Sequence, residues 1–93
     1  MRYNAKTDQN QAEIVAALRA VGATVHPIHR LGGGLPDLLV GYRGQNYLLE
    51  VKTATGHLTP DEAKFFQTWR GQVAIVRNIT QALAAIDITK SNP

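Results

Sequence analysis

The sequence predicts an α/β fold, in which one mixed β-sheet is flanked by helices in the order α-β-β-β-α-β-α. Three observations lead to it: two strand-like runs around a short polar turn, a well-capped helix directly after them, and a short apolar run after that helix. A turn this short makes the first pair of strands antiparallel, whereas a strand-helix-strand connection makes its two strands parallel. The length of 93 residues, 44% of them hydrophobic, fits a single domain over residues 1–93 with one core.

The first helix is expected from about Gln9 to Val21, where apolar residues recur at helical spacing. Thr7 or Asp8 can serve as its N-cap, and Gly22 stands where a helix commonly ends.

A short strand is expected next, from Thr24 to Ile28. Pro27 restricts it to an edge of the sheet, because proline has no amide to donate to a neighbouring strand. Residues 29–36 contain three consecutive glycines and are expected to be irregular.

Residues 37–42 and 46–53 are typical of two strands of a hairpin. A two-residue turn at Arg43-Gly44 would pair Tyr42 with Gln45, whereas a bulge there would shift the register by one residue. The sequence leaves this register open.

The second helix has the clearest boundaries. Thr59 is its expected N-cap, Pro60 stands at the first helical position, and Glu62 completes a capping box; the helix should run to about Arg70. The remaining expected elements are an apolar strand, an amphipathic helix and a frayed tail: residues 73–76, 80–86 and 89–93.

Composition narrows the function classes. The absence of cysteine excludes a disulfide framework, a thiolate zinc site and a cysteine nucleophile. The polar N-terminus and the lack of a long apolar run predict a soluble, cytoplasmic protein with no membrane partner. A net charge of +3 and a pI near 9.6 suit an anionic partner without proving one.

Two acids and a lysine are expected to converge on the hairpin. With Tyr42 opposite Gln45, counting along the strands places Asp37 opposite Glu50. Glu50 and Lys52 share a face, because strand side chains alternate. Two carboxylates this close repel each other unless a cation lies between them, and Mg²⁺ or Mn²⁺ prefers such oxygen ligands. Lys52 could orient a water molecule or stabilise charge on a phosphate. We therefore predict a catalytic centre of Asp37, Glu50 and Lys52.

The motif Pro36-Asp37 followed by Glu50-Val51-Lys52 resembles the PD-(D/E)XK signature of restriction-type nucleases. Its surroundings, Gly34 to Leu39, Leu49 to Lys52 and Leu58-Thr59-Pro60, resemble the VRR-NUC (virus-type replication-repair nuclease) family, which includes small stand-alone proteins. The likeness extends from the helix of Glu13 to Val76.

The resemblance implies a restriction-endonuclease-like fold and metal-dependent hydrolysis of DNA, with branched or four-way-junction DNA as expected substrates in DNA repair. It implies metal ligation by Asp37, Glu50 and the Val51 backbone carbonyl, with Lys52 catalytic. Glu13 matches a position where relatives carry an acid near the metal. The chain departs from the family at Glu62, where relatives often carry glutamine, and Gln67 lies further along the same helix.

Four further residues are candidates for DNA contact: Arg30, Gly33, Gly34 and Lys64. The glycines could let a bulky ligand approach the backbone. Simpler interpretations stay open. Asp37 could have no role beyond forming a turn. Glu50 and Lys52 could belong to a solvated strand face. The side chains of Glu13, His26, His29 and Lys64 could be ordinary surface residues.

Phe65, Phe66 and Trp69 lie at helical spacing on the second helix and predict core or dimer contacts, so a homodimer is expected. The alternative function is a catalytically inactive nucleic-acid-binding module of the same fold. A purely structural interaction protein, the third possibility, would have no affinity for divalent metals.

Overall fold

A computed structural model of the chain describes residues 5–86. In chain order its elements are α1 (Ala5–Ala20), β1 (Thr24–Pro27), the 3₁₀ turn η1 (His29–Leu31), β2 (Leu38–Tyr42), β3 (Gln45–Val51), α2 (Pro60–Thr68), β4 (Val73–Val76) and α3 (Ile79–Ala85). The predicted order of helices and strands is confirmed. The predicted frayed tail, residues 89–93, lies outside the described residues. No helix within residues 5–86 is long and apolar enough to cross a membrane.

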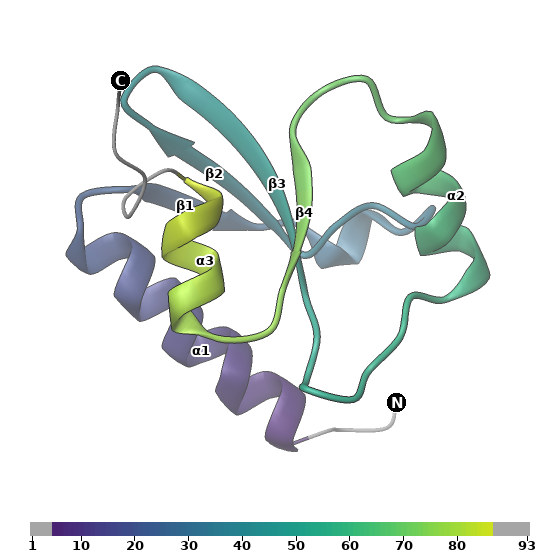
Figure 1. Ribbon diagram of the computed structural model, residues 1–93, viewed down its shortest axis with the longest axis horizontal. Coiled ribbons are helices and arrows are strands. Elements are labelled where there is room, and N and C mark those ends of the chain that lie inside the picture. The colour runs from purple at the N-terminus through teal and green to yellow at the C-terminus, as the bar shows by residue number, and fades with distance from the viewer. Residues whose placement is uncertain (1–4, 87–93) are drawn as a thin grey trace.

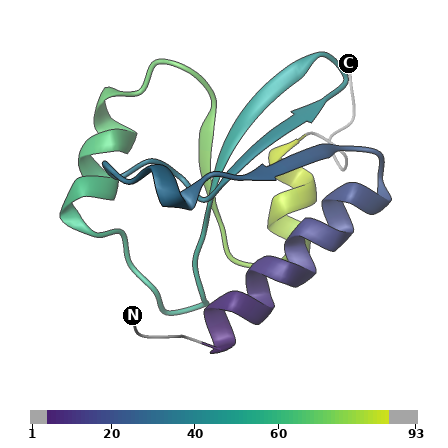
Figure 2. The same ribbon diagram turned by 180° about the vertical axis from the view of Figure 1, so that it is seen from behind.

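The four strands form one sheet in the order β1-β2-β3-β4. The first two pairs are antiparallel, and β3 pairs with β4 in parallel, so the predicted mixed sheet is confirmed. The strand that contains Pro27 lies at the edge, as expected. Helices α1 and α3 lie together on one side of the sheet, while α2 stands apart on the other side (Figures 1 and 2).

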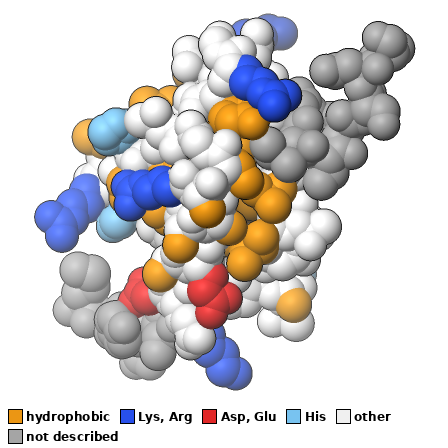
Figure 3. All heavy atoms as spheres, turned by 90° about the vertical axis from the view of Figure 1, so that its left-hand side faces the viewer, with side chains coloured by type: hydrophobic (Ala, Val, Ile, Leu, Met, Phe, Trp, Pro, Cys, Tyr) orange, Lys and Arg blue, Asp and Glu red, His pale blue; other side chains and the backbone are white. Residues whose placement is uncertain are grey.

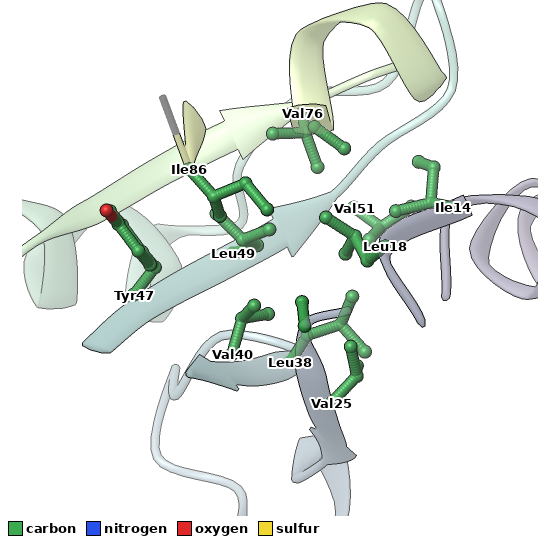
Figure 4. Packing of buried hydrophobic residues seen from close by; sticks show 12 residues of the cluster. Ile14, Leu18, Val25, Leu38, Val40, Tyr47, Leu49, Val51, Val76 and Ile86 are labelled. Atoms are coloured by element: carbon green, nitrogen blue, oxygen red, sulfur yellow. The ribbon is translucent and has the colours of Figure 1, made fainter. Parts of the chain in front are cut away.

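The hydrophobic core lies between the sheet and the α1–α3 pair. Ile14 and Leu18 of α1 are completely buried, and alternate residues of β3 point toward them (Figure 4). The same cluster includes Val25, Leu38, Val40, Tyr47, Leu49, Val51, Val76 and Ile86. Because strand side chains alternate, the intervening residues of β3, Leu48 and Glu50, face the side on which α2 stands.

The turn between β2 and β3 fixes the register that the sequence left open. Arg43 and Gly44 have φ values of +51° and +79°, which is the geometry of a two-residue type I′ turn. Tyr42 therefore pairs with Gln45, and the pairing runs without a bulge to Leu38 opposite Leu49. The Arg43 guanidinium lies over the Tyr42 ring, 5.0 Å from its centre.

The N-terminal boundary of α1 differs from the prediction. The helix already includes Ala5, so Thr7 and Asp8 are helical residues and not its N-cap. Both residues tolerate a helix, and an acid such as Asp8 in the first turn interacts favourably with the positive end of the helix dipole. A capping residue type is therefore a weak boundary signal here.

Helix α2 begins with the predicted capping box. The Thr59 hydroxyl accepts a hydrogen bond from the Glu62 amide at 3.2 Å, and Glu62 Oε1 accepts one from the Thr59 amide at 2.8 Å. The helix ends at Thr68, slightly before the predicted end, and it contains no fully buried residue.

Gly34 packs closely against α2, which has half-buried residues but none that is fully buried. Its φ is +78°, and a Cβ atom at this position would overlap the carbonyl oxygen of Asp61 in α2. The glycine run was expected to admit a ligand; at Gly34 the close approach is made by the backbone of α2 itself. Gly33 also has a positive φ, +68°, but it has open space around it.

We predict that Gly34→Ala is more destabilising than Gly33→Ala. Both substitutions place a side chain at positive φ, at about 1–2 kcal/mol each. Only the first also forces the loop away from α2, which adds a further ~1–3 kcal/mol. Urea unfolding of the two variants measures the difference, and equal free energies of unfolding would contradict the close packing.

Candidate active site

The three residues predicted to be catalytic lie together at the end of β3, on the side of the sheet that faces α2. They line a cavity of about 300 Å³. Its other lining residues come from the start of α1, the β3–α2 connection and α2: Thr7, Val51, Thr53, Gly56, His57 and Glu62.

Asp37 is the last residue before β2, one step beyond the pair Leu38–Leu49. Its Oδ2 atom accepts a hydrogen bond of 2.9 Å from the backbone amide of Val51. The carboxylate is therefore tied to the neighbouring strand beside Glu50, as the predicted register requires.

Glu50 is the unusual residue of the site. Its exposed fraction is 2%, and no other charged residue within residues 5–86 is fully buried. Oε2 lies 3.4 Å from Lys52 Nζ, whereas Oε1 is buried without a hydrogen-bond partner among the described residues. A buried carboxylate oxygen without a partner is costly, so this atom is suited to a bound cation.

Burial changes the acidity of both acids. Burial, and then the charge of Asp37, raise the pKa of Glu50 from 4.5 to about 8. Burial also raises the pKa of Asp37, although the Val51 amide opposes this effect. At neutral pH the metal-free site therefore keeps the Glu50 carboxyl largely protonated, and a divalent cation would have to displace that proton.

Lys52 keeps its charge in this site. Burial would lower the pKa of its ammonium, but the hydrogen bond to Glu62 and the charge of Glu50 outweigh burial and raise it. A lysine whose pKa is raised is a hydrogen-bond donor and a fixed positive charge, and it does not serve as a general base near neutral pH.

Glu62 reaches this site from α2. Its Oε1 atom accepts a 2.8 Å hydrogen bond from Lys52 Nζ, and the same oxygen caps the helix at the Thr59 amide. Burial alone would raise the pKa of Glu62, but Lys52 and the Thr59 amide lower it. The sequence marked Glu62 as a departure from the family but did not reveal this contact. The capping box was the available signal, because it turns the Glu62 side chain back toward the segment that follows Lys52.

Asn10 and Arg77 hold the backbone around Lys52, and no pattern in the sequence indicates either contact. Asn10 Nδ2 donates to the carbonyl of Lys52 at 3.1 Å and to that of Arg77 at 3.2 Å. The Arg77 guanidinium donates to the carbonyls of Thr53 and Gly56, at 2.7 and 2.8 Å. These bonds fix the connection between β3 and α2.

The structure does not bring Glu13 to the other candidate metal ligands. Glu13 is exposed on α1, accepts a hydrogen bond from Gln9 and does not line the cavity. No three His, Cys, Asp or Glu side chains in the described part of the chain are grouped to hold a metal. The α1 residue at the cavity is Thr7, about 9 Å nearer the start of the helix than Glu13, at 1.5 Å per residue. The assignment of Glu13 to the metal stays a prediction, which the position of this side chain does not support.

The four candidate DNA-contact residues lie on the α2 helix and the loop beside it. Arg30 is exposed on η1, and Gly33 and Lys64 line one cavity of about 330 Å³. Gly34 packs against α2 instead. On the side of the molecule away from α2, Lys and Arg side chains are scattered and not gathered into one patch (Figure 3).

The aromatic residues of α2 are only partly covered. Phe65 and Phe66 are half-buried, and the ring of Trp69 stacks on that of Phe65, with centres 5.1 Å apart. Trp69 is 44% exposed and borders an apolar cavity of about 320 Å³ with Leu39 and Leu48. His26 and His29 are exposed, on β1 and η1.

The donor set fits a hard divalent cation. Asp37 and Glu50 offer two carboxylates, and the oxygen Glu50 Oε1 is buried without a partner among residues 5–86. The backbone carbonyl of Val51 would be a third oxygen donor. Mg²⁺ binds through one or two carboxylates and keeps several waters, so this small set is sufficient for it.

A solved structure described as a "VRR_NUC domain" is similar to this chain over most of its length. The two agree with a TM-score of 0.69 and 26% sequence identity, and the match covers 90% of this chain and 97% of the other. No model of a known protein family matches the sequence, and no curated protein matches it.

The metal-free protein should lose stability as the pH rises from about 4.5 to about 8. In this window folded Glu50 holds a proton that the unfolded chain has released, so the free energy of unfolding falls with rising pH. The slope for one group is at most ~1.4 kcal/mol per pH unit. Urea unfolding with a chelator at several pH values measures it, and Glu50→Gln should flatten the profile. An identical slope in the variant would contradict the burial of Glu50 as the cause.

Proposed function

We propose, from the premise that this chain belongs to the VRR-NUC family by its fold and its motif, that it is a metal-dependent nuclease that hydrolyses DNA phosphodiester bonds. One observation carries the proposal: the buried Glu50 carboxylate, with an oxygen that no described residue satisfies, lies between Asp37 and the ammonium of Lys52. This arrangement is costly to the fold, and a buried acid with a strongly shifted pKa is characteristic of functional sites.

We assign the cation, Mg²⁺ or Mn²⁺, to Asp37, Glu50 and the Val51 carbonyl. When bound, such a cation polarises a phosphate oxygen and makes a bound water more acidic. The hydrogen bond from the Val51 amide orients Asp37 for this task, and the hairpin register holds Glu50 next to it.

Lys52 would act on the phosphate as a charged donor. Its Nζ atom is held at the site, and its raised pKa keeps it protonated at neutral pH. A fixed ammonium stabilises the negative charge that develops on the phosphate oxygens in the transition state, or orients the attacking water.

The substrate we propose is DNA, with branched or four-way-junction DNA preferred. A net charge of +3 favours a polyanion. Lys64 of α2 and Gly33 line one cavity, Arg30 is exposed on η1, and α2 also reaches the site through Glu62. Phosphate contacts from such residues would position a strand without reading its sequence. Lys64→Ala should then weaken binding of all DNA alike.

We also propose a homodimer formed through the exposed part of the α2 side. Trp69 and Leu39 are 44% and 40% exposed and border one apolar cavity, and monomers rarely leave large apolar patches uncovered. A two-fold dimer would provide two sites for the two strands of a branched substrate.

Two variants should distinguish metal binding from cleavage. Asp37→Ala should lose both, because it removes a metal ligand. Lys52→Ala should keep its Mn²⁺ affinity but lose about 10²–10³-fold in cleavage rate, as expected for one transition-state donor. Calorimetry with Mn²⁺ measures the first property. Cleavage of linear, supercoiled, flapped and junction DNA, with Mg²⁺, Mn²⁺, Ca²⁺ or chelator, measures the second.

The wild-type protein with chelator is the blank for these assays, and circular dichroism confirms that each variant is folded. Mn²⁺ affinity unchanged in Asp37→Ala would refute the metal assignment. Wild-type protein that binds DNA and metal but leaves every substrate intact would favour the non-catalytic binding module.

Light scattering should report about twice the monomer mass of 10.2 kDa at micromolar concentration. Trp69→Ser should shift the protein toward monomer, because it removes the largest exposed apolar side chain of the patch. Val21→Ser, which changes an exposed apolar residue at the end of α1, serves as the control. A wild-type monomer that still cuts both strands of a junction would refute the dimer and its two-site mechanism.

A further inference from the structure

We propose that Glu62 is a positioning residue that holds the Lys52 ammonium at the site of cleavage. This inference rests on the proposed nuclease function and adds a second carboxylate partner for the lysine, contributed by α2. Glu62 does not touch the reacting atoms in this account; it acts through Lys52.

The contact with Glu62 is the stronger of the two that Lys52 makes. Nζ lies 2.8 Å from Glu62 Oε1 but 3.4 Å from Glu50 Oε2. Lysine has a flexible four-carbon side chain, so its ammonium stays at one place only where partners fix it. Charge-assisted hydrogen bonds of this length are about twice as strong as neutral ones.

Glu62 is itself rigidly held, which qualifies it as an anchor. The oxygen that accepts from Lys52 also accepts from the Thr59 amide, and the Thr59 hydroxyl binds the Glu62 amide in return. A carboxylate in the first turn of a helix is further stabilised by the helix dipole. Lys52 is therefore tied to the start of α2, and Gly34 packs against the same turn.

The role of Glu62 becomes larger when a cation is bound. Glu50 is one of the carboxylates proposed to hold the cation. Once it binds the cation, its negative charge attracts Lys52 less strongly. Glu62 already binds the ammonium at 2.8 Å, so it can hold Lys52 when Glu50 is engaged with the cation. The ammonium would otherwise be free to turn away from the phosphate.

A helix cap alone would need only the Thr59–Glu62 pair, so the two roles can be separated by variants. Glu62→Ala removes both the cap contact and the anchor for Lys52. Thr59→Ala removes the hydroxyl half of the capping box but keeps the backbone amide and Glu62, and it serves as the matched control. Glu62→Gln keeps an acceptor oxygen without the charge.

Steady-state kinetics on cleaved DNA is the first measurement. Glu62→Ala should lower kcat about 10²-fold, as misplacement of a catalytic group by about 1 Å does, with KM within a few-fold of wild type. Glu62→Gln should recover part of the loss. Thr59→Ala should lower the melting temperature but keep kcat within about threefold of wild type.

The second measurement needs no activity and no metal. In the metal-free protein, an amine-acylating reagent followed by peptide mass spectrometry gives the labelling rate of Lys52, with Lys64 as an internal exposed reference. Lys52 should react more slowly than Lys64 in wild type and Thr59→Ala, and several-fold faster in Glu62→Ala than in wild type.

The two measurements distinguish the failure of this inference from that of the nuclease function. Glu62→Ala with wild-type kcat, while Lys52→Ala is inactive, overturns the positioning role and leaves the nuclease intact. If wild type cleaves nothing, the nuclease proposal fails, and labelling alone decides whether Glu62 holds Lys52. An unchanged Lys52 labelling rate in Glu62→Ala overturns the anchor.

Discussion

The candidate site depends on the confinement of two carboxylates at the open end of one hairpin. Asp37 and Glu50 are held together because the Arg43-Gly44 turn sets an uninterrupted register along β2 and β3. Burial makes this pairing unfavourable and raises the pKa of Glu50 to about 8. The core on the opposite face of the sheet must supply the stability that keeps these acids in place, because the pair itself opposes folding at neutral pH.

Lys52 supplies positive charge beside the pair. Lys52 directly follows β3 and its ammonium lies near Glu50, while Glu62 of α2 binds the same ammonium at the shorter distance. This accounts for the position of α2, which has no buried residue of its own and yet lies close against the loop at Gly34. In this arrangement α1 and α3 cover the core, whereas α2 contributes Glu62 to the site.

Local signals in the sequence predicted much of this arrangement. Alternation along the strands and the short turn gave the hairpin and the convergence of Asp37 with Glu50, and the Thr59–Glu62 spacing gave the start of α2. Glu13 does not line the cavity, whereas Thr7 does, because residue type alone does not fix which side of a helix faces the site. The contacts of Asn10 and Arg77 join segments far apart in the chain, so no local pattern could reveal them.

The central claim is that this carboxylate pair exists to bind a divalent cation. Crystals grown with Mn²⁺ and measured at a wavelength where manganese scatters anomalously test it directly, because the ion itself becomes visible. The account predicts an anomalous peak at about 2.0–2.3 Å from oxygens of Asp37 and Glu50, as expected for a small divalent ion on oxygen ligands. A map in which manganese binds elsewhere, or leaves Glu50 Oε1 without a partner, would contradict it.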